Sequence, residues 1–270
     1  MTAIGIGPEV RRRLSARRTA EIVAEELRRQ ILDGELADGD LLPRQDILVD
    51  RFKVSLVSLR EALRILETEG LISVRRGNRG GAVVHAPANS SAAYMLGLVL
   101  QSDSVRLTDL GRALQELEPS CAAMAATRQD RATTLVPVLV ALNDLAEQHL
   151  DDGSRFTDIG RQFHHEIAMG CGNHTMAAVM GSLEALWSSH ERQWAEKTAA
   201  QGEYPSLGAR RTVHAAHVKL TAAIEAGDVE RARRLAARHA ADTQTYVVAD
   251  DPDQRVHALP AQVMSRTRRS

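Results

Sequence analysis

The spacing of hydrophobic residues changes twice along this chain, and these changes limit what it can fold into. Up to Gly70 the apolar residues recur every three or four positions, as on the buried face of a helix. Over residues 71–85 they form two short β-type runs, LISVRR and GAVVH, joined by a glycine-rich turn. From residue 92 to 248 the helical spacing returns and no strand pattern is found. We therefore predict a mostly α chain, in which a small α+β unit precedes an all-α bundle of six to seven helices.

Three helices are expected before the β-type runs. The first covers residues 18–33, and Pro43 stands where a short second helix over RQDILVDRF begins. The third, LVSLREALRILETEG, has Ser55 or Ser58 as its N-cap, and Ser58 with Glu61 has the spacing of a capping box. Helix, short helix, turn, helix and hairpin is the order of a winged helix-turn-helix, in which one helix fits the major groove of B-DNA. The alternative is a small α+β domain whose arginines are merely solvated.

Composition divides the chain further and excludes several classes of protein. A hydrophobic content of 44% excludes global disorder, and no run of about 18 uncharged apolar residues predicts a membrane span. Two cysteines 50 positions apart argue against a disulfide framework and favour a cytoplasmic protein. Residues 1–86 carry a net charge of +2 and the remainder −3. The expected parts are a flexible N-terminus (1–14), a winged helix-turn-helix (15–86), a linker (87–92), a helical domain (93–249) and a mobile tail (250–270).

Nine of the ten histidines lie after residue 86, in the helical part of the chain. His217 and His239 stand on either side of the turn at Ala226–Gly227, each about ten residues from it. At about 1.5 Å of rise per residue, both lie roughly 14–17 Å from that turn. In an antiparallel helix pair they would be level and would face each other.

Several segments resemble a known family. The stretch from GELADGDLLPRQ through REALRILETEGL to RRGNRGG resembles the DNA-binding domain of GntR-type bacterial regulators. The segments DLGRALQELEP, FHHEIAMGCGN and HAAHVKLTAAIEAGDVERARRLAARH resemble the all-α effector domain of the FadR subgroup, called FCD. The two resemblances cover nearly all of residues 17–245. They imply a homodimeric transcription regulator, more commonly a repressor, which binds a double-stranded DNA operator under the control of a small molecule.

The resemblance also places residues at the DNA. Ser55 and Arg60 match the family's recognition helix, in which Leu56 stands where the family has Arg. We expect Leu56 and Val57 to meet thymine methyl groups, and Arg60 and Arg44 to bind phosphate or guanine. The wing adds five expected DNA-binding residues, Arg75, Arg76, Gly77, Asn78 and Arg79.

Metal-binding members of the FCD group use one Asp and three His, and the three His match His164, His217 and His239. The Asp belongs four residues before the first His, where this chain has Gly160. Asp158 cannot replace it, because on a helix it lies ~120° around from His164. Three imidazoles with open positions suit a divalent metal such as Zn²⁺ or Ni²⁺, with water or an effector carboxylate completing the shell. The alternative is a polar pocket without metal.

The expected effector pocket contains Gly160 and four further residues. Leu114 stands four residues before Glu118, where the family often has Arg, which suggests a less acidic or more lipophilic effector. His214 precedes His217 by three residues and is expected to lean toward it. Asn173 matches a Gly-Asn pair of the family, with a helix cap as its alternative role. Organic acids and lipid-like molecules are the effector classes to screen.

Two other functions agree with parts of the pattern. A metal-dependent hydrolase or lyase would need a general base, but the chain has no HExxH or GxSxG motif. An architectural DNA-binding protein would leave the polar histidines of an apolar bundle unexplained, since burying polar groups is costly unless they are paired or liganded. We therefore expect a regulator and not an enzyme.

Overall fold

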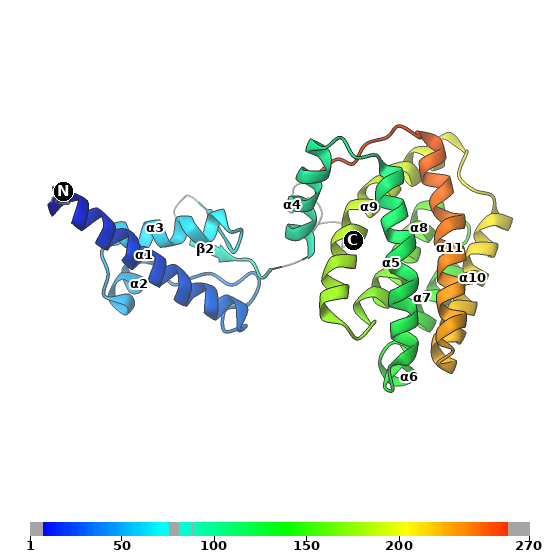
Figure 1. Cartoon of the computed structure of the whole chain (residues 1–270), viewed down its shortest axis with the longest axis horizontal. Coiled ribbons are helices and arrows are strands. Elements are labelled where there is room, and N and C mark those ends of the chain that lie inside the picture. The colour runs from blue at the N-terminus through cyan, green and yellow to red at the C-terminus, as the bar shows by residue number, and fades with distance from the viewer. Residues whose placement is uncertain (1–7, 76–80, 88, 259–270) are drawn as a thin grey trace, which may run out of the picture. The chain divides into compact units, whose positions relative to one another are not determined.

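The computed structural model describes residues 8–75, 81–87 and 89–258, and the chain divides into two compact units, Met1–Ala88 and Asn89–Ser270 (Figure 1). The described residues are mostly helical, with one β-hairpin in the first unit and helices alone in the second. The predicted fold class is confirmed. No helix in the described ranges has the length and apolar character needed to cross a bilayer.

The first unit is a three-helix domain with a two-stranded wing. Its core lies between α1 and α3, where Leu27, Leu59 and Leu66 are fully buried, and Val84 of the hairpin closes it. The hairpin is antiparallel, with Ile72 opposite Val84. The elements are α1 (Pro8–Leu32), α2 (Gln45–Phe52), α3 (Leu56–Thr68), β1 (Ile72–Arg75) and β2 (Gly81–Val84).

Two local features of this unit differ from the prediction. Helix α1 begins at Pro8 and not at residue 18, so it runs into the expected flexible N-terminus. Proline is favoured at a first helical position, and the arginines, leucine and alanine that follow are good helix formers. The N-cap of α3 is Ser55, whose Oγ accepts the backbone N–H of Ser58 at 3.1 Å. The expected capping box at Ser58 and Glu61 is wrong, because Ser58 already lies inside the helix.

The second unit is a helical bundle, in which α5 lies beside α11, α8 beside α9, and α10 beside α11 (Figure 1). Its core includes Leu139, Phe163 and Met180, which are fully buried. Helical spacing continues through residues 131–148, but the structure divides this stretch into α6 and α7, because Pro137 starts a new helix in its first turn. The helices are α4 (Asn89–Ser102), α5 (Leu107–Thr127), α6 (Arg131–Thr134), α7 (Val136–Gln148), α8 (Gly153–Met169), α9 (His174–Gln201), α10 (Leu207–Ala226) and α11 (Val229–Asp250).

Regular structure extends further at both ends of this bundle than the spacing of apolar residues predicts. Helix α4 starts at Asn89, inside the expected linker, because Asn and Ser followed by Ala suit a helix start. Residues 251–258 pack on the bundle instead of forming a mobile tail. Val256 is 0% exposed, and its N–H donates to the Val105 carbonyl at 2.9 Å. The remainder of the expected tail, 259–270, lies outside the described residues.

Candidate functional site

Helix α3 buries one face and exposes the other. Leu59 and Leu63 face the core, whereas Arg60 and Arg64 are exposed one turn apart. The middle turns of α3 therefore expose side chains of both charges, because Glu61 and Glu67 are exposed as well and the Glu61 carboxylate lies 3.6 Å from the Arg64 guanidinium. Its first turn, by contrast, exposes two adjacent apolar side chains, Leu56 and Val57.

A hollow of about 530 Å³ lies beside this exposed face. The Arg60 guanidinium donates to Oε1 of Gln45 on α2 at 3.4 Å, which spans one side of the hollow. On the other side, the N–H of Val74 in β1 donates to the Glu67 carboxylate at 3.1 Å, so strand β1 is tied to α3. The hollow is thus bounded by α2, α3 and strand β1. Its lining residues are Gln45, Arg60, Leu63, Arg64, Glu67 and Val74.

The remaining expected DNA-binding residues are placed in part. The side chain of Arg44 is exposed and lies 3.4 Å from the carboxylate of Asp46, which weakens its charge toward a phosphate. Ser55 serves as the N-cap of α3, and Arg75 is the last residue of β1. The wing residues Arg76, Gly77, Asn78 and Arg79 lie outside the described residues.

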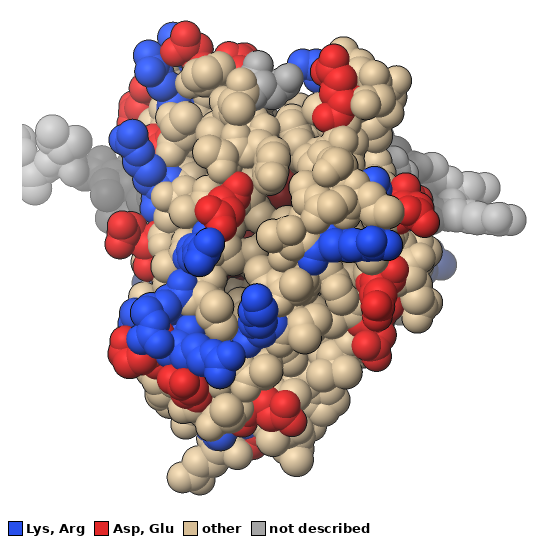
Figure 2. Space-filling model, turned by 90° about the vertical axis from the view of Figure 1, so that its right-hand side faces the viewer, with Lys and Arg blue, Asp and Glu red and all other residues tan. Residues whose placement is uncertain are grey.

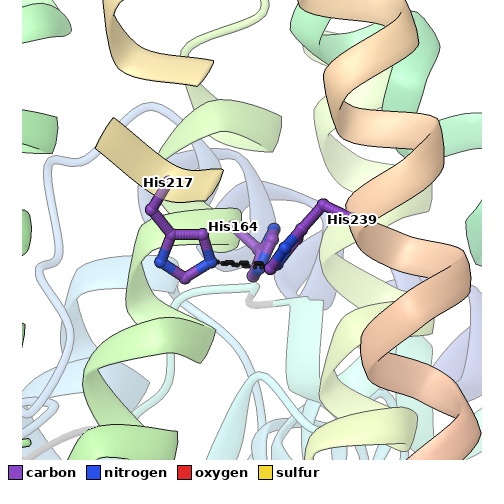
Figure 3. A group of neighbouring side chains, drawn as sticks. All are labelled: His164, His217 and His239. Carbon is purple, nitrogen blue, oxygen red and sulfur yellow. Dashed lines mark hydrogen bonds between the residues drawn. The ribbon is translucent and has the colours of Figure 1, made fainter. Parts of the chain in front are cut away.

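Three histidines converge inside the bundle (Figure 3). His164 comes from α8, His217 from α10 and His239 from α11, and their Nε2 atoms point toward one another. The Nε2–Nε2 distances are 3.1 Å between His164 and His239, 3.2 Å between His164 and His217, and 2.9 Å between His217 and His239. His217 and His239 are only 2% and 5% exposed. They face each other across the antiparallel α10–α11 pair, as their spacing from the intervening turn predicts.

Glu118 of α5 is the partner of one of these rings. Its carboxylate contacts Nδ1 of His164, so that Nδ1 carries the hydrogen and Nε2 faces the centre of the cluster. Burial opposes both charges, but the charge and hydrogen bond of the partner outweigh it. The pKa of His164 is therefore raised and the pKa of Glu118 is lowered. A carboxylate behind an imidazole is the arrangement that orients metal-binding histidines.

The other two rings are held neutral. Burial, followed by the neighbouring histidines, keeps the pKa of His217 well below its ordinary value. Burial and the charge of His164 lower the pKa of His239 to about 3. Facing lone pairs of neutral imidazoles repel unless a proton or a cation lies between them. A tetrahedral Zn²⁺ with Zn–N bonds of about 2.0–2.1 Å would separate its ligand nitrogens by about 3.3 Å, close to the distances in the cluster. The donor set and its spacing therefore fit a divalent metal.

Of the other residues expected in the effector pocket, some lie beside the triad and others do not. A Cβ built on Gly160 would meet His217 Cε1 at 3.7 Å and no closer atom, so a side chain could start here in ordinary contact with the cluster. His214 does not join the converging nitrogens, because its Nε2 bonds to the Asn143 carbonyl at 3.1 Å. Leu114 is buried in the hydrophobic core. Asn173 is the exposed N-cap of α9, where its side chain accepts the N–H of Met176.

No sequence motif indicates the charged side chains that lie near His164 on α8 and α9. Arg161, three residues before His164 on α8, donates to Asp158 at 2.7 Å, and Arg192 of α9 lies 3.6 Å from the same carboxylate. Burial raises the pKa of nearby Glu191 to about 7. The i−3 spacing of Arg161 from His164 was the one available signal, since such residues share a helix face. Residue spacing could not show that α9, which carries Glu191 and Arg192, packs against α8.

Known protein families match both units. The model of the gntR family of bacterial regulatory proteins matches residues 19–84, and the FCD domain model matches residues 109–242. The match to the gntR model coincides with the three helices and the hairpin. The match to the FCD model contains Glu118 and all three histidines of the cluster.

Curated relatives and a solved structure extend these matches. The Exu regulon transcriptional regulator of Escherichia coli (strain K12) is 27% identical over 185 residues, and the alignment covers 66% of each chain, just under two thirds of the relative's length. The HTH-type transcriptional repressor NanR of Klebsiella aerogenes is 30% identical over 182 residues, which cover 66% of this chain and 68% of NanR. The structure of Streptococcus agalactiae GntR superposes with a TM-score of 0.59 and 21% identity, covering 83% of this chain and 98% of that one. The last similarity concerns the fold alone.

Proposed function

Since the chain belongs to the gntR family of bacterial regulatory proteins, as a member of its FadR subgroup with a C-terminal FCD domain, we propose that it is a homodimeric repressor under effector control. Its winged helix-turn-helix binds operator DNA, and a small molecule in the bundle sets the affinity of that binding. This family consists of transcriptional regulators and not of enzymes. The relative NanR is named a repressor, which supports repression as the mode of action.

The observation that carries the proposal is the exposed face of α3. A helix that is anchored by Leu59 and Leu66 and presents Arg60 and Arg64 to solvent is suited to enter a major groove. The hairpin beside it would lie along the adjacent backbone. The face of the bundle in Figure 2 carries basic and acidic side chains together, as the exposed face of α3 does, so the proposal rests on the shape of the helix-turn-helix and not on an excess of positive charge.

The histidine cluster supports the second part of the proposal, control of DNA binding by a small molecule. His164, His217 and His239 would hold the metal, and Glu118 would keep the His164 ring oriented. When bound, a divalent ion would act as a Lewis acid that attracts an oxygen of the effector. Gly160 lies beside the His217 ring and has no side chain that could supply a fourth protein ligand, so water or an effector oxygen would complete the shell. The roles of Leu114, Asn173 and His214 in an effector pocket stay predictions.

Coupling between ligand and operator would pass through the helices that carry the cluster. Helices α5, α8, α10 and α11 each contribute a residue to it, so a ligand that moves one of them changes the packing of the others. Any such coupling is reciprocal: a ligand that weakens operator binding is itself bound more weakly in the presence of operator. In a dimer this would alter the spacing of the two winged domains, which must match the spacing of the half-sites.

A gel-shift experiment tests the DNA-binding half. The full chain is titrated against a duplex from upstream of its own gene, with an unrelated duplex of equal length as competitor. We expect Arg60→Ala to abolish the specific shift, whereas Arg17→Ala, which removes an exposed arginine of α1, leaves it unchanged. A specific shift that survives Arg60→Ala would show that α3 does not read the operator.

Metal analysis tests the second half. Protein purified without chelator is assayed for transition metals before and after incubation with zinc, in parallel with a His217→Ala variant. We expect close to one equivalent in the wild type and none in the variant. Less than about a tenth of an equivalent in the wild type, with no gain on adding zinc, would refute the metal centre.

A further inference from the structure

The first turn of α3 carries two exposed apolar side chains. Leu56 is 41% exposed and Val57 is 73% exposed, although both begin a helix whose next apolar residue, Leu59, is completely buried. They are adjacent in sequence and lie at the end of α3 that a helix-turn-helix inserts into the groove. Neither side chain can donate or accept a hydrogen bond, so neither could recognise a base by its polar edge.

The backbone of this turn is held firmly. Ser55 is extended, with φ −71° and ψ 152°, and its Oγ accepts from the N–H of Ser58 and lies 3.0 Å from the Ser58 hydroxyl. Because Ser58 is buried, the cap is anchored in the domain and not in solvent. Leu56 and Val57 are therefore presented on a fixed turn, which lowers the entropy that a partner must overcome in contacting them.

Two arginines follow this apolar pair on the exposed side of α3. Arg60 follows Leu56 by one helical turn, and the side chain of Arg64, which is 76% exposed one turn further on, lies 3.6 Å from the carboxylate of Glu61. Arg44, before α2, is also exposed and lies beside Asp46. An apolar tip that is followed by guanidinium groups does not suit a hydrophobic protein partner or a lipid interior. It suits a polyanion whose recessed surface carries apolar groups, and the major groove of DNA has this character where thymine methyl groups project into it.

We propose that Leu56 and Val57 recognise the 5-methyl groups of thymine in the operator, so that each half-site contains thymine where they enter the groove. Of the four bases, thymine alone carries an apolar substituent on its major-groove edge. This inference rests on the proposed operator binding and specifies how part of that operator is read. Arg60 would contribute a polar contact beside the methyl groups, while the apolar pair selects the base.

The expected loss of affinity follows from the size of the thymine methyl group. Removing one buried methyl from an interface lowers the affinity by about threefold to fourfold, because a CH₂-sized group contributes that much on transfer from water. Two methyl groups per half-site would give about tenfold. Effects of this size are well resolved by fluorescence anisotropy at fixed salt.

The experiment uses the full-length protein and duplexes that it selects from a randomised pool. Each thymine of the selected half-site is replaced singly by uracil, which removes the methyl and preserves base pairing. We expect a loss of about threefold to fourfold at one or two positions and none at the others. Leu56→Ala and Val57→Ala should bind more weakly and lose this sensitivity to uracil, whereas Ile22→Ala, which truncates an exposed apolar residue of α1, should retain it.

The outcomes separate the two proposals. Failure to select any specific duplex would refute the operator-binding function itself. Specific binding that no uracil substitution weakens would refute methyl recognition and leave operator binding intact. Sensitivity to uracil that persists in both alanine variants would assign the methyl contact to another residue, and the inference would again be wrong. Thermal melting of each variant confirms that it is folded, which is expected because both substituted side chains are exposed.

Discussion

Glu118→Gln is the substitution that tests how the histidine cluster is built. The glutamine keeps the size of the side chain and an oxygen that can accept from Nδ1 of His164, but it removes the negative charge. In the wild type this charge stabilises the His164 ring and fixes the tautomer whose Nε2 faces the cluster. Loss of such a carboxylate typically weakens metal affinity by about 10–100-fold, which is about 1.4–2.7 kcal/mol. The side chains of His164 and Glu118 are only 22% and 12% exposed, so weak screening by solvent puts the expected loss toward the upper half of that range.

The assay is competition for zinc between the protein and a chelating dye at pH 8, where protons compete little for the imidazoles. Glu184→Gln is the matched control, because Glu184 makes the same kind of contact, at 3.1 Å, with Nδ1 of the neighbouring His165. His165 is not part of the cluster, so this variant should bind zinc within about threefold of the wild type. Equal affinity in the wild type and Glu118→Gln would refute the orienting role of Glu118, and equal losses in both variants would assign the effect to general electrostatics.

Three further substitutions have defined outcomes. Gly160→Asp adds a carboxylate at a position whose Cβ would contact the His217 ring, so zinc affinity in the same competition assay should rise by at least about tenfold; an unchanged value would place this side chain outside the coordination shell. Burial holds the pKa of Glu191 at about 7, whereas the same carboxyl in the unfolded chain ionises near pH 4.5. The free energy of unfolding therefore falls as the pH rises from about 5 to 7, by up to about 3 kcal/mol. Urea unfolding of metal-free Glu191→Gln should therefore show a flatter pH dependence than the wild type over this interval, and parallel curves would contradict the burial. Val256→Ala should lower the free energy of unfolding by about 1.5–3 kcal/mol, since it removes two fully buried methyl groups; a change below about 0.5 kcal/mol would mean that residues 251–258 do not pack on the bundle.

The order of helices and strands could be predicted from the sequence because local physics decides it. Apolar residues spaced by three or four, then the runs flanking GNRG, distinguish helix from hairpin without reference to distant contacts. The level positions of His217 and His239 follow in the same way, since helix rise and the turn at Ala226–Gly227 determine them. The motifs also sufficed to identify His164 as the third histidine.

Other features depended on groups that are distant in sequence. Spacing left Ser55 and Ser58 both available as the N-cap, and only the packing of Ser58 against the domain decided between them. The weak hydrophobic pattern after residue 250 concealed the packing of Val256, because a single well-placed side chain and a few backbone hydrogen bonds have no period.

At the cluster itself, the sequence determined which imidazoles the helices carry, and the tertiary structure determined what surrounds them. Glu118 lies 46 positions before His164, and no helical rule connects the two. The packing of α5 against α8 brings them together. Likewise, only the assembled bundle places the ring of His217, from α10, beside Gly160 of α8. Periodicity reports which face of a helix is buried, but the identity of the opposing residue is a property of the assembled bundle.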